Sequence, residues 1–199
     1  MDMADATGEG YPLVLQSGAD PSTLGGVAVC GLTTVGSVGV IAASHLIASL
    51  GLKPMGTVIH PEFPAVALIQ ESVPKHPVRV YQGEEMGVFI SEIQFPQASD
   101  FQFGNTVLEW FQKGGFDRLV IIDGLVSEDL GLKEDGDIWG VASLQSGRDA
   151  LDTVGIQRIQ QGIVTGVSGF LLAEGERQGL DITVPVSYTH LTLPTISRV

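Results

Sequence analysis

The chain has 199 residues, 44% of them hydrophobic and 17% charged, and a formal net charge of −13. This length suits one globular domain that buries most of the surface of its unfolded chain. With 10 basic residues against 23 acidic ones, the sequence offers no cationic cluster for nucleic acid or for an anionic membrane surface. The single cysteine, Cys30, excludes an internal disulfide and indicates a reducing, cytoplasmic setting. The longest apolar stretch, residues 38–52, is too short to span a bilayer.

The first clear unit along the chain is a strand, a glycine-containing turn and a helix. Residues 27–30 are a short apolar run of strand character, residues 31–37 are the turn, and residues 38–50 are almost all apolar or small. A helix N-terminus that follows a strand commonly holds anions, because unpaired backbone N–H groups point there. This turn has neither the Lys-Ser/Thr pair of a Walker loop nor a G-x-G-x-x-G pattern. The unit therefore has the architecture of a nucleotide site without its chemistry, which favours binding over catalysis.

Further strands and turns are predicted in the first half of the chain. Residues 1–10 are polar and are predicted to be disordered. Alternation of apolar and polar residues predicts a hairpin that pairs residues 65–70 with residues 78–81. The other elements predicted here are an edge strand over 12–15, a strand over 55–60, a rigid Pro-Glu-Phe-Pro turn over 61–64 and a central strand over 87–93.

The second half of the chain alternates helices and strands. A helix is predicted to begin at Ser99, with Gln102 completing a capping box, and to end at the glycine pair Gly114-Gly115. The remaining predicted elements are a buried strand over 118–123, an acidic loop over 127–137, strands over 138–142, 163–165 and 181–184, and helices over 145–153 and 166–178. This alternation predicts an α/β domain with a mostly parallel sheet that helices cover on both faces.

Residues 186–199 form a tail that is considered separately from the domain. The run from Val186 to Thr195 matches, codon by codon, the translation of a transposase sequencing adapter. We therefore expect a single native domain over residues 11–185, truncated near Pro185, and a non-native tail over residues 186–199. The alternative is a natural strand, because Tyr, Thr and Leu have β-strand character. Truncation at this point would leave a sheet edge or an apolar face uncovered and would favour aggregation.

A series of segments in order resembles the proteasome assembly chaperone family, in particular its archaeal-type relatives of proteasome assembly chaperone two. Residues 31–51 read G-L-T-T-V-G-S-V-G-V-I-A-A-S-H-L-I-A-S-L-G, where the family has a glycine turn and a helix of the form G-x-V-G-x-x-A-A-x-x-L-I. Residues 59–64 read I-H-P-E-F-P, where the family has an acidic residue, phenylalanine and proline. The resemblance continues through residues 78–81, 88–94, 121–125 and 166–172, and covers residues 11–184.

The resemblance implies a three-layer α/β/α sandwich that works by binding, with no enzymatic activity and no cofactor. Members of the family help the α-subunits of the 20S proteasome to assemble and guard against wrong contacts. Proteasome α-subunits and further copies of the chain, in a homo-oligomer, are therefore the expected partners in an archaeal-type cytoplasm. Several members end in a hydrophobic–tyrosine–any residue motif that inserts between α-subunits. The last three residues here, Ser197-Arg198-Val199, do not match that motif, and Tyr188 is not penultimate.

A small-molecule or nucleotide-binding protein, or an enzyme, on the same scaffold is the alternative, and it would use Gly31, Gly36, Ser37 and Asp123. Asp123 ends a predicted central strand, a position where α/β proteins bind ligands, although Asp before Gly is also ordinary turn chemistry. Ser37 is equally a helix cap, and the glycines equally allow a helix to pack close to a sheet. No cation converges on the turn, and the four His have no spacing typical of a metal site.

Aromatic and proline residues in two turns are the candidates for contact with a partner protein. Phe63 and Pro64 lie in the first turn, and Phe95 and Pro96 lie in the second. An aromatic ring in a turn is either incompletely buried, as at an interaction surface, or packed beneath its own loop. A scaffold protein with other partners is a third hypothesis.

Overall fold

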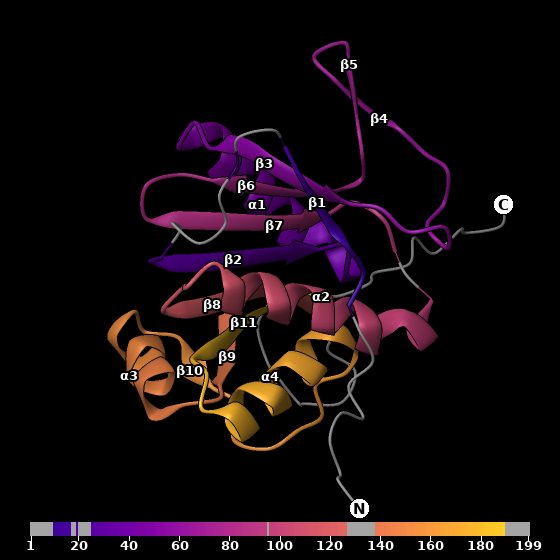
Figure 1. The fold of residues 1–199 in the computed structure, drawn as a ribbon. Coiled ribbons are helices and arrows are strands. Elements are labelled where there is room, and N and C mark those ends of the chain that lie inside the picture. The colour runs from indigo at the N-terminus through magenta and orange to yellow at the C-terminus, as the bar shows by residue number, and fades with distance from the viewer. Residues whose placement is uncertain (1–9, 17–18, 20–24, 95, 127–137, 190–199) are drawn as a thin grey trace, which may run out of the picture.

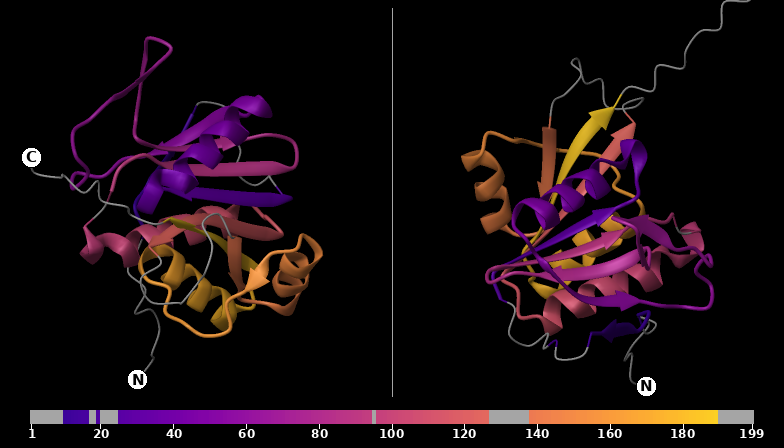
Figure 2. Two further views of the ribbon diagram at one scale, coloured as in Figure 1. Left: turned by 180° about the vertical axis from the view of Figure 1, so that it is seen from behind. Right: turned by 90° about the horizontal axis from the view of Figure 1, so that it is seen from above.

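The computed structural model describes residues 10–16, 19, 25–94, 96–126 and 138–189, and these residues form a three-layer α/β/α sandwich. Helices cover both faces of a nine-stranded sheet, as the views in Figure 1 and Figure 2 show. The predicted α/β class and its three layers are confirmed. Residues 1–9, Phe95, the predicted acidic loop over 127–137 and residues 190–199 lie outside the described ranges.

The nine strands of the main sheet lie in the order β1-β3-β6-β7-β2-β8-β11-β9-β10. Their bounds are β1 Leu13–Leu15, β2 Val27–Leu32, β3 Lys53–Val58, β6 Val78–Gln82, β7 Met86–Ser91, β8 Arg118–Val126, β9 Ile138–Ala142, β10 Gln157–Arg158 and β11 Ile182–Thr189. The centre of the sheet, β7-β2-β8-β11, is parallel. Antiparallel pairing joins β1 to β3, β3 to β6, β6 to β7 and β11 to β9. The sheet is therefore mixed and not mostly parallel as predicted, because β1, β6, β9 and β10 run against the central strands.

The predicted pairing of residues 65–70 with residues 78–81 is wrong. Strand β4 (Leu68–Gln70) pairs instead with β5 (Val73–Lys75), and these two strands form a separate sheet. Strand β6 lies between β3 and β7, where Val78 and Val80 are fully buried. Burial on both sides explains the difference, since a strand that is covered on both faces gains more inside a large sheet than in a free hairpin.

Four α-helices flank the sheet: α1 Val38–Ser49, α2 Asp100–Lys113, α3 Gln145–Thr153 and α4 Gly166–Gln178. Helices α2 and α4 cover one face and pack against each other, whereas α1 and α3 lie on the other face. The predicted capping box is wrong, because Ser99 ends the 3₁₀ turn η3 (Gln97–Ser99) in helical geometry and its side chain makes no cap hydrogen bond. None of the helices in the described ranges is long and apolar enough to cross a membrane.

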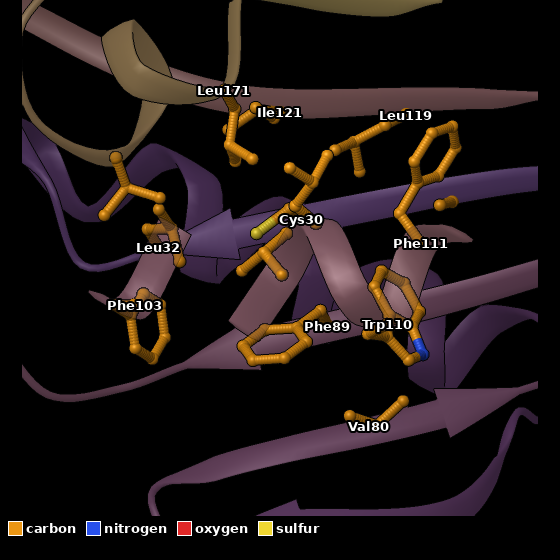
Figure 3. Packing of buried hydrophobic residues seen from close by; sticks show 14 of the residues in the cluster. Cys30, Leu32, Val80, Phe89, Phe103, Trp110, Phe111, Leu119, Ile121 and Leu171 are labelled. Atoms are coloured by element: carbon orange, nitrogen blue, oxygen red, sulfur yellow. The ribbon is translucent and has the colours of Figure 1, made fainter. Parts of the chain in front are cut away.

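The main core lies between the central strands and helices α2 and α4. Figure 3 shows Phe103, Trp110 and Phe111 of α2 and Leu171 of α4 on one side of this core, facing side chains of the sheet that include Cys30. Cys30 is fully buried, as its apolar neighbours in sequence predict. Burial, together with the nearby charge of Asp123, raises the pKa of the Cys30 thiol far above its usual range. The thiol is therefore a packing group and not a nucleophile.

Candidate functional site

The carboxyl ends of β2, β3, β7 and β8 meet at one edge of the sheet, because these four strands run in the same direction. The chain leaves β2 toward α1 on one face and leaves β7 toward α2 on the other. Ligands of α/β proteins commonly bind where neighbouring strands send their helices to opposite faces. A cavity of about 380 Å³ lies at this edge, between the ends of β2, β7 and β8 and the first turns of α2 and α4. We call it the edge cavity.

The edge cavity is lined by acidic, neutral polar and apolar groups. The carboxyl groups of Asp100 and Asp123 lie in its wall, with the hydroxyl groups of Thr33 and Thr34, and no Lys or Arg of the described residues lines it. Asp100 is the first residue of α2, and burial raises the pKa of its carboxyl group. The N-termini of α2 and α4 would attract an anion, but the carboxyl groups of Asp100 and Asp123 already place negative charge beside them. The cavity is therefore unsuited to a phosphate group.

The chain's own donors satisfy the carboxylate of Asp123. One oxygen, Oδ1, accepts the backbone N–H of Gly124 at 2.7 Å, and Oδ2 accepts the hydroxyl of Ser168 at 2.5 Å. Ser168 lies in the first turn of α4, so this bond ties the end of β8 to the start of that helix. Asp123 itself is only 5% exposed. Its environment is that of a structural carboxylate, with few lone pairs left for a ligand.

Gly31, Gly36 and Ser37 do not line the edge cavity with Asp123, although Thr33 and Thr34 of the same turn do. Gly31 faces α1, and a methyl group at its Cα would lie 2.3 Å from the backbone oxygen of Gly39. Gly36 has φ 70°, and Ser37 follows it in the left-handed region with no side-chain cap hydrogen bond. Of the four predicted residues, Asp123 alone lines the edge cavity. The packing interpretation of the glycines is therefore confirmed for Gly31, whereas the proposed cap by the Ser37 hydroxyl is wrong.

Nucleotides are expected not to stabilise the protein. ATP or inorganic phosphate added to the wild-type chain should leave the melting temperature unchanged, because a ligand raises Tm only when it binds the folded state. Differential scanning fluorimetry with a series of nucleotides measures this. A rise in Tm that disappears in both Ser37→Ala and Asp123→Ala would contradict the expectation and would favour the small-molecule alternative.

The two partner-contact turns follow strands β3 and β7 at the same sheet edge. The ring of Phe63 is half-buried and meets Tyr11 edge-on, with 5.0 Å between ring centroids. The ring centroids of Tyr11 and His60 are 4.4 Å apart. The Phe63 ring therefore packs beneath its own loop, within an aromatic cluster. Pro64 and Pro96 are exposed. The prolines therefore contribute to the surface of these turns, together with exposed neighbours such as Glu62 and Val66, and Phe95 lies outside the described residues.

Arg79 forms a buried polar network that the sequence interpretation missed. Its guanidinium forms an ion pair with Glu92, with 8% and 17% of the two side chains exposed, and donates to the hydroxyl of Tyr81 at 3.0 Å. Arg79 also donates to the backbone oxygen of His76, and Gln70 donates to Glu92 at 3.4 Å. The network thus ties the β4–β5 hairpin to the main sheet at His76, just after β5, and at Gln70, beside the turn. An arginine inside an otherwise apolar strand was the available signal, because such a charge requires a partner.

Residues 28–197 match the model of the PAC2 family. The chain belongs to the PAC2 family. Among solved structures, this PAC2-family protein is similar to Pyrococcus furiosus PbaA, an archaeal homolog of proteasome-assembly chaperone, with 26% identity, a TM-score of 0.78, and coverage of 89% of this chain and 76% of PbaA. No curated protein sequence matches the chain.

Two further solved structures share the fold of this PAC2-family protein. A Thermoplasma acidophilum protein of unknown function has 24% identity, a TM-score of 0.75, and coverage of 88% of this chain and 72% of its own. Pyrococcus furiosus PbaB, an archaeal proteasome activator, has 17% identity, a TM-score of 0.71, and coverage of 92% and 81%. The family and the fold of the proteasome assembly chaperone homologues are thus shown for this chain, and the resemblance seen in its sequence is confirmed.

Proposed function

We propose that this PAC2-family protein is a non-enzymatic chaperone that binds proteasome α-subunits and assists assembly of the 20S particle. Its likeness to PbaA over 89% of the chain carries the proposal, because that protein is an archaeal homolog of a proteasome-assembly chaperone. We further propose that it acts in the cytoplasm as a homo-oligomer, as the family resemblance implies.

The chemistry of the carboxyl edge supports a binding role. Asp123 is buried and accepts hydrogen bonds from Gly124 and Ser168, and the described lining of the edge cavity offers no cation and no activated nucleophile. Within the part of the chain that the structure describes, no three His, Cys, Asp or Glu side chains are grouped to hold a metal ion. A general acid–base mechanism requires a titratable group close to a substrate, and the hydrogen bonds of Asp123 to Gly124 and Ser168 favour a structural role for it instead.

We assign the α-subunit contact to the two turns that follow β3 and β7. Pro64 and Pro96 are exposed there, and both turns lie at the edge where the central strands end. Prolines fix the local backbone, so this surface loses little conformational entropy when a partner binds to it. The acidic chain also suits a partner whose contact surface has a basic rim.

Co-purification tests the proposal. The tagged chain, co-expressed with proteasome α-subunits of the same genome, should retain them through affinity purification, and native mass spectrometry should show the complex. The double variant Pro64→Lys/Pro96→Lys should weaken binding by at least about tenfold, because it places positive charges against the basic rim expected of the partner. Val154→Lys, at an exposed position after α3, should bind like the wild type. Absence of any complex with the wild-type chain would contradict the proposal.

A further inference from the structure

The β4–β5 hairpin projects from the body of the molecule, as Figure 1 and Figure 2 show. Each of its strands has three residues, and the two strands pair only with each other. Ile69 is 68% exposed and Val73 is 52% exposed, so the hairpin presents apolar side chains to solvent. An isolated two-stranded hairpin is marginally stable in water. This hairpin therefore requires a further contact to bury its apolar side chains.

The turn of the hairpin does not provide that stability. Glu71 and Ser72 connect the strands, with φ of 51° and 64°. A two-residue connection with both residues at positive φ favours Asn-Gly, because side chains of other residues strain the left-handed backbone. The local sequence thus opposes the conformation that the hairpin adopts. Strained backbone persists where surrounding contacts determine it.

A groove of about 730 Å³ separates the hairpin from α1. Ile47 and Ala48 of α1 line one wall, and Val73 and Pro74 of the hairpin line the other. The Arg79–Glu92 network bonds to His76, just after β5, and to Gln70, beside the turn, and so fixes the hairpin relative to the main sheet. The lining also includes polar side chains such as Ser44, Gln70 and Lys75, so the groove suits a partner segment that has both apolar and polar groups.

Helix α1 is the one described α-helix without a charged residue, although the whole chain has a net charge of −13. Its outer surface includes Ile41, which is 64% exposed. A helix that is apolar all round is normally buried on all sides. Two copies of so acidic a chain repel each other wherever their charged surfaces approach. Contact through the uncharged helix α1 involves the least electrostatic repulsion.

We propose that this groove takes the β4–β5 hairpin of a second copy of the chain. The hairpin carries one charge of each sign, since Glu71 lies at its tip and Lys75 at its base, so it can pair with a second hairpin of the same sequence. Two hairpins that run antiparallel place Glu71 of one copy near Lys75 of the other, and a two-fold axis repeats the contact. Ile69 and Val73 lie on opposite faces of the hairpin, because Ile69 pairs with Pro74 and Val73 pairs with Gln70. One of the two side chains is then buried against α1 of the second copy and the other against its hairpin. This inference deepens the proposed function by naming the surface on which the homo-oligomer assembles.

Sedimentation velocity of purified protein, across a range of concentrations, tests the proposal. Ile69→Ser/Val73→Ser should weaken assembly by at least about tenfold, and it should not unfold a monomer in which both side chains are exposed. Ser72→Gly relieves the strained turn without changing either apolar surface, so it should assemble like the wild type. Ile163→Ser removes another exposed apolar side chain, outside the groove lining, and should also have no effect. Unchanged assembly of the double variant would overturn the proposal, as would a wild type that is monomeric at every concentration.

Charge reversal provides an independent test of the register. Glu71→Lys and Lys75→Glu should each weaken assembly, and the variant carrying both should regain it. Failure of the combined variant to recover would overturn the antiparallel arrangement of hairpins. Hairpin-dependent assembly without α-subunit binding would contradict the proposed function alone, whereas α-subunit binding by a chain whose assembly ignores the hairpin would contradict this inference alone.

Discussion

Arg79→Ala should lower the free energy of unfolding by about 3 kcal/mol or more, the cost expected when one partner of a buried ion pair is removed. The substitution leaves the Glu92 carboxylate 17% exposed and without its cation. It also frees the hydroxyl of Tyr81 and the backbone oxygen of His76 from their donor. Urea unfolding followed by circular dichroism measures the loss.

Two companion variants separate the buried pair from a general effect of charge removal. Lys113→Ala breaks the exposed pair between Lys113 and Glu109 and should change stability by no more than about 0.5 kcal/mol. Arg79→Met/Glu92→Met removes both buried charges, so it should be more stable than Arg79→Ala. A loss below about 1 kcal/mol for Arg79→Ala would show that water solvates Glu92 and that the network does not anchor the hairpin.

Gly31→Ala should cost about 3 kcal/mol, the upper part of the range for overpacking a core. The added methyl group would lie 2.3 Å from the backbone oxygen of Gly39 and 2.5 Å from the Cβ of Ala43. Neither atom belongs to a flexible side chain, so α1 must move away from the sheet. Thermal and urea unfolding of the variant measure the effect.

Ser37→Gly provides a control of opposite sign in the same turn. Ser37 has φ 52° and no cap hydrogen bond, so glycine should raise stability by about 1 kcal/mol. If Gly31→Ala were tolerated and Ser37→Gly destabilising, the turn would be held by contacts of the serine side chain. The packing account of the glycine turn would then be wrong.

Local patterns in the sequence identified the central elements of the fold. The apolar run at residues 27–30 became the middle strand β2, and the helices predicted over 145–153 and 166–178 have those bounds. Patterns were less informative where a strand's partner lies far away in the chain. Residues 78–81 alternate like a hairpin strand, yet burial on both sides places them between β3 and β7. The predicted strand over 163–165 is absent, because these residues precede α4 without pairing to the sheet.

The boundary at Pro185 stays a prediction. Strand β11 continues through Val186 to Thr189 and pairs with both β8 and β9. Strand pairing uses backbone groups, and Val186 is buried, so a foreign segment of β-strand character would pair there as readily as a native one.

The candidate site was predictable in position but not in chemistry. Asp123 lies in the second half of the central strand β8, which the sequence indicated would end there but which continues to Val126. Its bond to Ser168 joins residues 45 positions apart, and only the packing of α4 on β8 creates it. The glycine turn was likewise compatible with either a bound ligand or a helix packed close to the sheet. The close approach of Gly31 to Gly39 favours the packed helix.

Isothermal titration calorimetry of the purified chain, with purified proteasome α-subunits in one series and ATP in another, is the most direct measurement. A chaperone whose helix N-termini are neutralised by its own carboxyl groups should release binding heat with α-subunits and none with ATP. Binding and turnover of ATP, with no heat from α-subunits, would contradict the account.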